Sequence, residues 1–279
     1  MRVVNSKIIA DEVKKMCIEA NIVLGNDVKD KIKESIDNEK SETGKSILKI
    51  LLENAKKAEN NNIPICQDTG MAVFFVKVGQ DVIVEGETLT EAINRGVSEG
   101  YTEGYLRKSV VSPINRQNTG DNTPAIIHYE FVKGDKIEIE FAAKGFGSEN
   151  MSALKMLKPS DGIEGIKKFI IDTVSEAGPN PCPPTIIGIG IGGTMEKCCE
   201  MAKKALFRDL GKHNLDDDIA KLEKDILKEI NDLGIGPQGF GGSTTSLGVN
   251  IETYPTHIAG LPVAVNINCH ASRHRKVII

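Results

Sequence analysis

A short polar stretch, residues 63–70 (IPICQDTG), divides this chain into two parts with different hydrophobic patterns. Before it, apolar residues recur every three or four positions, as in amphipathic helices; directly after it, residues 73–78 form the apolar run VFFVKV, which is typical of a strand. Pro64 restricts the local backbone, and Gly70 permits a turn that other residues resist. We therefore expect a helix-to-strand connection here, held on a rigid scaffold of the kind that often carries function.

Residues 1–62 are predicted to be helical. One apolar stripe contains Ile9, Val13 and Met16, and later stripes run through residues 28–36 and 47–58. Cys17 lies near the apolar edge of the first stripe, so we interpret it as a core residue. The lysine and glutamate runs of this region are interpreted as solvated helix faces.

Beyond residue 62, strand and helix patterns alternate. The helices are expected at residues 88–107, 162–177, 195–210 and 215–232, with the last two forming a peripheral arm. The strands are expected at residues 73–78, 81–84, 125–132, 136–142, 185–191, 249–254 and 261–267. Gly134 and Asp135 favour a hairpin turn between two of these strands. The pattern predicts a mixed α/β (α+β) fold in one large domain over residues 1–279, with a helical part at 1–62 and an α/β part at 63–279.

Composition excludes several classes of function. The net charge is −4, the pI is about 5.8, and tryptophan is absent, so neither a basic nucleic-acid footprint nor a base-stacking platform is present. The charged N-terminus lacks the apolar core of a signal peptide, and no apolar run reaches the length of a membrane span. We expect a cytosolic (cytoplasmic) protein that binds neither nucleic acid nor membrane.

Three polar or glycine-rich loops are candidate ligand sites. Residues 115–124 could orient carboxylates or form a solvated turn, and residues 144–150 could grip an anion or form a strand-to-helix turn. Residues 188–193 match the G-x-G-x-x-G pattern of dinucleotide sites. A dinucleotide site also requires a following strand that ends in an acidic residue about 20 positions on, whereas here the chain continues as a helix. The match is therefore weak. The glycines could still expose amides to a carboxylate.

The six cysteines fall into two groups. Cys66, Cys182 and Cys269 each lie on a predicted loop, whereas Cys17, Cys198 and Cys199 lie on predicted helices and are interpreted as packing residues. Four prolines surround Cys182 and hold it on a stiff segment. Three loop thiolates could ligate a [4Fe–4S] cluster with one open iron. Zinc is the competing metal, although zinc sites favour clustered ligand spacing, and plain packing is the remaining alternative.

Several motifs together resemble those of one enzyme family. The chain is similar over most of its length to the alpha subunit, or N-terminal half, of the iron–sulfur (class I) fumarate hydratases and L(+)-tartrate dehydratases. The matching motifs are PICQDTG at 64–70, NTGDNTP at 118–124, KGFGSEN at 144–150, PCPP at 181–184, the glycine run at 188–193 and NCH at 268–270.

This resemblance implies a [4Fe–4S] cluster held by Cys66, Cys182 and Cys269, with one iron open to substrate. It implies reversible hydration of fumarate to L-malate by a hydro-lyase. Two rival interpretations stand beside it: dehydration of L(+)-tartrate, and a non-catalytic metal-binding or regulatory subunit. Asp68 and His257 match active-site positions and are the expected catalytic residues.

The resemblance also implies a substrate-binding set and a partner. Gln67, Arg107, Gly145 and Gly147 are the expected substrate-binding residues, with Arg116 as a rival of Arg107. Phe146 and Glu149 stand where the family has a motif richer in glycine. The remaining active-site residues are expected on a beta subunit, in an α2β2 hetero-oligomer, with a homodimer of this chain as the other possibility.

Overall fold

The computed structural model describes all residues from 1 to 279 and confirms a mixed α/β fold. The chain folds into two compact units. The first unit contains Met1–Gly25, Ala55–Phe146 and Arg273–Ile279, and the second contains Asn26–Asn54 and Gly147–Ser272. The chain therefore passes from one unit to the other more than once, and each unit is described by itself.

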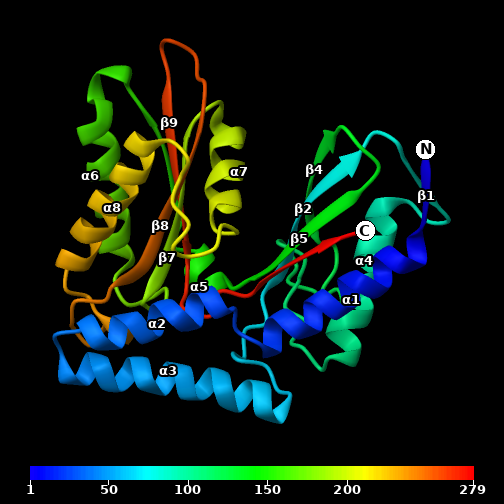
Figure 1. The fold of residues 1–279 in the computed structure, drawn as a ribbon, viewed down its shortest axis with the longest axis horizontal. Coiled ribbons are helices and arrows are strands. Elements are labelled where there is room, and N and C mark those ends of the chain that lie inside the picture. Colours follow the sequence, from blue (N-terminus) through cyan, green and yellow to red (C-terminus); the bar gives the residue numbers. More distant parts are fainter. The chain divides into compact units, whose positions relative to one another are not determined.

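The first unit is built on a four-stranded sheet. Its strand order is β10 (His274–Ile278), β5 (Ile137–Lys144), β2 (Met71–Gly79) and β4 (Ile126–Val132), and the short strands β1 (Arg2–Asn5) and β3 (Val82–Glu85) pair separately. Helices α1 (Ser6–Ile22) and α4 (Leu89–Glu103) lie against each other beside the sheet (Figure 1). Strand β1 falls inside the region predicted to be wholly helical, because four residues are too few to interrupt a helical pattern.

The core of the first unit lies between the sheet and these two helices. Phe74, Phe141 and Ile139 are fully buried there with Cys17, which confirms its assignment to the core. Helix α1 approaches α4 closely because Gly96 has no side chain; a Cβ there would lie 2.5 Å from the carbonyl oxygen of Ala10. Thr88 caps α4 by accepting from the amide of Glu91, whose carboxylate accepts from the amide of Thr88.

The predicted hairpin between residues 125–132 and 136–142 is wrong. Strand β2 lies between β4 and β5, pairing parallel with β4 and antiparallel with β5. Five successive residues of β2, from Ala72 to Val76, are buried. A strand that is buried on both faces gains most from a central position with a neighbour on each side, and this preference outweighs the local turn signal at Gly134.

The second unit has three layers. Its sheet has the order β6 (Ala153–Leu157), β9 (Leu261–Asn268), β7 (Thr185–Gly192) and β8 (Ser246–Tyr254). Helices α6 (Gly162–Ala177) and α8 (Asp217–Asp232) cover one face, and α7 (Met195–Ala205) covers the other (Figure 1). The remaining helices are α2 (Asn26–Asn38), α3 (Glu42–Asn61), in which a unit boundary falls, and the short α5 (Phe146–Glu149).

Strand β7 shows why the glycine run of residues 188–193 folds in this way. Ile187 and Ile189 belong to the core that α6 and α8 cover. Gly188 and Gly190 face α7, and a Cβ on either would lie 2.1 Å from a backbone carbonyl oxygen of that helix. These two glycines therefore permit close packing of helix on strand, and the G-x-G-x-x-G pattern has a structural cause that needs no dinucleotide.

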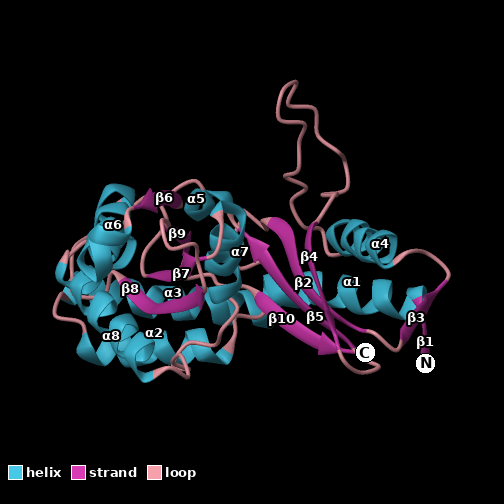
Figure 2. Ribbon diagram, turned by 90° about the horizontal axis from the view of Figure 1, so that it is seen from above, coloured by secondary structure: helices cyan, strands magenta, loops and turns pink.

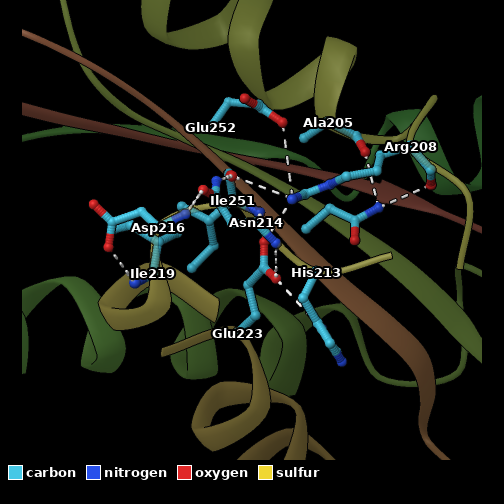
Figure 3. A network of polar contacts seen from close by, with 10 residues as sticks. Ala205, Arg208, His213, Asn214, Asp216, Ile219, Glu223, Ile251 and Glu252 are labelled. Carbon is cyan, nitrogen blue, oxygen red and sulfur yellow. Dashed lines mark hydrogen bonds and ion pairs between the residues drawn. The ribbon is translucent and has the colours of Figure 1, made fainter. Parts of the chain in front are cut away.

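Helix α8 is not the peripheral arm that its charge pattern indicated, because Ile226 and Ile230 are fully buried in the core. Its Glu223 is only 2% exposed and accepts hydrogen bonds from Arg208 (2.5 Å) and from the amide of Ile251 in β8 (2.8 Å). Figure 3 shows this buried ion pair, which ties the connection between α7 and α8 to the sheet. Amphipathic helices with many charges can still be anchored by one apolar stripe and one paired carboxylate.

Candidate functional site

The loop of residues 63–70, called the Cys66 loop below, belongs to the first unit and is held in place by the carboxylate of Asp68. One carboxylate oxygen of Asp68 accepts from the amide of Gly70 and the other from the amide of Phe146, both at 2.9 Å. Gly70 has a φ of +74°, and a Cβ there would collide with the backbone of Ala143 and Lys144. The sequence DTG therefore folds as a tight turn against the end of β5, with Cys66 half-buried and Gln67 exposed at its start.

Arg107 is held beside this loop through its backbone. Its carbonyl oxygen accepts from the hydroxyl of Thr69 at 3.0 Å. Buried Asn122 donates to the carbonyl of Gly70 and accepts from the amides of Ser109 and Val110. The structure thus brings together Gln67, Asp68 and Arg107 at the base of the long loop between α4 and β4, which extends away from the sheet (Figure 2).

Arg273 supports the same loop from the interior. Its side chain is 2% exposed and donates to the carbonyl oxygen of Asp68 and to the side chain of Asn21. Gly145 lies against this pair, because a Cβ there would be 3.3 Å from both the Arg273 guanidinium and the Asp68 carboxylate. Gly145 is thus buried next to Asp68, and the neighbouring amide of Phe146 is already engaged by that carboxylate.

The second unit brings Cys182 and Cys269 to one end of its sheet. Cys182 lies three residues before β7, and Cys269 follows β9, whose Asn268 pairs with Ile186. The ring nitrogen Nδ1 of His270 lies 3.1 Å from the carbonyl oxygen of Cys182. The Gln238 side-chain amide donates to the carbonyl oxygen of Pro183 at 2.6 Å and lies 3.3 Å from the His270 ring.

His257 lies at the other end of this sheet. It is exposed in the loop after β8, and the last residue of β8, Tyr254, pairs with Gly192 at the end of β7. Strand β7 has eight residues, and at about 3.3 Å per residue His257 is separated from the Cys182 end by more than about 20 Å. Gly147, the remaining predicted substrate-binding residue, is exposed in α5 of the same unit, near Asn180. The structure therefore does not bring His257 to Cys182 and Cys269 within their own unit.

The six cysteines differ in accessibility. Cys17 and Cys198 are fully buried, and burial raises the pKa of the Cys198 thiol to about 12. Cys66 and Cys269 are half-buried, and Cys182 is exposed with a positive φ of 56°. None of the six is in a disulfide. The three loop cysteines thus offer accessible sulfur donors, which fits the donor chemistry of an iron–sulfur cluster. The interpretation of Cys199 as a packing residue is wrong, because this thiol is exposed.

Several residues that shape the site carry no sequence signal of their own. Gln238 stands in a glycine-rich loop that resembles a flexible linker, and Arg273 stands in a basic C-terminal tail that resembles a solvated end. A single buried Asn or Tyr is equally hard to recognise from sequence. Asn122 and Tyr101 are both fully buried, and the Tyr101 hydroxyl donates to the carbonyl of Thr69 at 2.7 Å. Only the position of Asn122 inside the NTGDNTP motif could have indicated its importance.

Comparison with known proteins places this arrangement in a family. The family model described as fumarate hydratase (Fumerase) matches residues 10–278. The chain belongs to the fumarate hydratase family. It is 47% identical to the putative L(+)-tartrate dehydratase subunit alpha of Methanocaldococcus jannaschii over 272 residues, which are 95% of either chain. It is 36% identical to the L(+)-tartrate dehydratase subunit alpha of Escherichia coli K12 over 258 residues, covering 91% of this chain and 85% of that one.

These findings confirm the family resemblance and a hydro-lyase as the class of enzyme. The match includes all the positions discussed above, from the Cys66 loop to Arg273. In addition, none of the helices is both long enough and apolar enough to cross a lipid bilayer.

Proposed function

We propose that this chain is the alpha subunit of a [4Fe–4S]-dependent hydro-lyase that hydrates fumarate reversibly to L-malate. The single observation that carries the proposal is the pairing of an accessible Cys66 loop with Arg107, through Thr69, in a chain of the fumarate hydratase family. This hydrogen bond holds the backbone of Arg107 beside the thiol-bearing loop, and an arginine at that position is suited to a negatively charged substrate that must lie near a metal group.

Cys66, Cys182 and Cys269 would hold the cluster in this proposal. When bound, the cluster supplies a Lewis-acidic iron that makes a hydroxyl a better leaving group. The stiffness of the Cys182 segment, flanked by prolines and fixed by Gln238 and His270, suits a ligand whose position must not relax.

The chain's own residues bind and orient the substrate. Arg107 is exposed and would bind a carboxylate of the dicarboxylate, because the planar guanidinium of arginine can donate two parallel hydrogen bonds to a carboxylate. Gln67 is exposed one residue after Cys66 and is placed to donate to a second carboxylate or to the hydroxyl. Asp68 accepts hydrogen bonds from two backbone amides and so keeps the loop in place. In this proposal it also orients or supplements the group that removes the carbon-bound proton.

We propose that Gly145 acts by letting Asp68 and Arg273 approach each other, and that exposed Gly147 supplies a backbone amide toward substrate. His257 remains a predicted proton donor or positioning residue. His257 lies at the opposite end of its sheet from Cys182 and Cys269. Within its own unit, it could therefore act on a substrate only at a site away from these two cysteines. The rest of the active site, including the principal base, is proposed to come from a beta subunit, as the names of the relatives as alpha subunits suggest.

Anaerobic reconstitution with iron and sulfide, with and without a candidate beta chain, tests the cofactor. Visible absorption and low-temperature EPR should report a cluster in the wild type and its loss in Cys66→Ser, Cys182→Ser or Cys269→Ser. Cys199→Ser is the matched control, because this cysteine is also exposed but lies on α7. A cluster that forms equally well in all four variants would overturn the proposal.

A second candidate substrate is L(+)-tartrate, favoured by the names of the relatives at 36–47% identity. Assays of L-malate and L(+)-tartrate side by side, with the beta chain present, separate the two. Arg107→Gln should raise the KM for either substrate, whereas Arg116→Gln serves as the control on the same loop. An unchanged KM in Arg107→Gln, or a rise only in Arg116→Gln, would transfer the binding role to the rival arginine.

A further inference from the structure

A groove in the second unit lies between α2, α8 and the start of β8 (Figure 1), and none of the residues with a proposed role in hydration lines it. It consists of two adjoining cavities of about 280 and 50 Å³, which share Lys31, Leu227 and Leu247 as lining residues. The larger cavity is also lined by hydroxyl and amide side chains, those of Ser35, Asn38, Asn231, Ser243, Thr244 and Ser246. The hydroxyl-rich end of the glycine-rich loop therefore forms one wall of a cavity.

The groove carries positive charge, although the chain as a whole has a net charge of −4. Its charged lining residues are four lysines and two glutamates, namely Lys31, Lys40, Lys212, Lys224, Glu34 and Glu223. Glu223 is 2% exposed and is already paired with Arg208, and exposed Glu34 is paired with Lys31. The ammonium groups of Lys40 and Lys224 have no carboxylate partner in the fold. Such an excess of cations along one cleft attracts an anionic ligand.

Asn231 of α8 provides a hydrogen-bond donor whose direction is fixed. Its Oδ1 accepts from the backbone amides of Thr245 (2.9 Å) and Ser246 (2.8 Å). These two bonds hold the side-chain amide in one orientation, and its Nδ2 has no partner in the fold. Because Asn231 lines the larger cavity, this donor is available to a ligand there. The nearby carboxylate of Glu39 is buried and saturated by donors of its own, and it does not line the cavity.

The kind of cation in the groove distinguishes between classes of anion. Arginine, with its planar fork, favours carboxylates, whereas lysine binds phosphate as a point charge, and the groove is lined by lysines without any arginine. The smaller cavity, lined by Lys31, Lys212 and Lys224, has room for one phosphate group. The larger cavity combines hydroxyl and amide groups with the apolar side chains of Leu227 and Leu247, a lining that suits a hydroxylated ring.

We propose that this groove binds a phosphorylated sugar, either free or as the ribose phosphate of a nucleotide. The phosphate group lies in the smaller cavity, where Lys31, Lys212 and Lys224 neutralise its charge. The sugar lies in the larger cavity, where its hydroxyls accept from Asn231 and Lys40 and its ring packs against the two leucines. This site is separate from the proposed hydration, because a dicarboxylate has no phosphate for the smaller cavity.

Isothermal titration calorimetry of the full-length chain with ribose 5-phosphate, AMP and inorganic phosphate tests the proposal. The two organic phosphates should bind at least about tenfold more tightly than inorganic phosphate, because only they fill the larger cavity. The tighter of the two shows whether the ligand is a free sugar phosphate or a nucleotide. An excess of L-malate should leave their dissociation constants unchanged, because the groove is not the site proposed for the dicarboxylate.

Two variants locate the site. Asn231→Asp still accepts from both backbone amides but turns the free donor into a negative charge, so it should weaken binding more than about tenfold while urea unfolding shows an intact fold. Lys31→Gln, which removes a cation that lines both cavities, should weaken binding about tenfold.

Lys33→Gln is the matched control, because Lys33 lies on the same helix, has a side chain 63% exposed and lines neither cavity. It should leave the affinity within about twofold of the wild type. Four results would each overturn the proposal: no binding of any of the three phosphates, equal affinity for inorganic phosphate and the organic probes, equal losses in Lys31→Gln and Lys33→Gln, or displacement by L-malate.

Discussion

Replacing Glu39 by glutamine should lower the free energy of unfolding of this protein by about 2–3 kcal/mol at neutral pH. Glu39 lies between α2 and α3 and is only 2% exposed. One of its carboxylate oxygens accepts from the amides of Lys40, Ser41 and Ser243 and from the Ser243 hydroxyl, and the other accepts from the amide of Thr244 at 2.8 Å. This carboxylate therefore fixes the glycine-rich loop of residues 234–246 to the start of α3.

The expected loss of stability can be estimated in two ways from the same set of hydrogen bonds. Burial alone would raise the pKa of Glu39, but the hydrogen bonds donated by Ser41, Ser243 and Thr244 outweigh burial and lower it to about 2 from 4.5. That difference corresponds to about 3 kcal/mol of stabilisation of the ionised form. A glutamine retains one acceptor oxygen but turns an amide N–H toward the amide of Thr244, and a buried donor without an acceptor costs about 1–3 kcal/mol.

Because the pKa is lowered on folding, the stabilisation is fully present above pH 4.5 and is lost as the pH falls toward 2. Urea unfolding of the wild type and of Glu39→Gln, followed by circular dichroism, should show a constant gap above pH 5 that narrows on acidification. Glu42→Gln, three positions away with a side chain 88% exposed, should change stability by less than about 0.5 kcal/mol. The reasoning is wrong if Glu39→Gln lowers the free energy of unfolding at pH 7 no more than Glu42→Gln does, and if hydrogen exchange at the amides of Ser243 and Thr244 is unchanged.

Three further predictions concern the second unit. Arg208→Met leaves the carboxylate of Glu223 buried without its cation and should cost about 3–5 kcal/mol in urea unfolding, most of which Arg208→Met combined with Glu223→Leu should recover. Gly190→Ala places a Cβ 2.1 Å from the carbonyl oxygen of Cys198, so it should lower the melting temperature of the protein strongly, whereas Cys198→Ala should lower it little. Iodoacetamide should label exposed Cys199 in the native protein but leave Cys198 unmodified until denaturation, as measured by mass spectrometry, although burial raises the pKa of both thiols.

Much of the fold could be predicted from hydrophobic periodicity, because that signal is local. The helix expected at residues 162–177 is α6 with the same bounds, and the strands around residues 73–78 and 261–267 are β2 and β9. The predicted hairpin at Gly134 failed because strand order is decided by distant partners. The position of α8 was misjudged because its charged residues outnumber the few isoleucines that anchor it.

The candidate site shows the same division between local and distant information. The Cys66 loop, with its proline, carboxylate and glycine, could be recognised as a rigid turn from its own residues. Arg273, more than 200 positions away, donates to the carbonyl oxygen of Asp68, and no local pattern indicates that contact. Gln238 likewise reaches the Cys182 segment across 55 positions. Such supporting contacts depend on the tertiary fold alone, and the residues next to them in the sequence carry no sign of them.

The residues of the CQDTG stretch have different structural roles, and these roles determine which side chains can contact a ligand. The carboxylate of Asp68 is bound to two amides, and the hydroxyl of Thr69 is bound to the carbonyl of Arg107, so both side chains hold the loop. Cys66 and Gln67 retain the exposure needed to contact a metal group or a substrate. A variant of Thr69 should therefore disturb the placement of Arg107, whereas a variant of Gln67 should change substrate affinity and leave the loop intact.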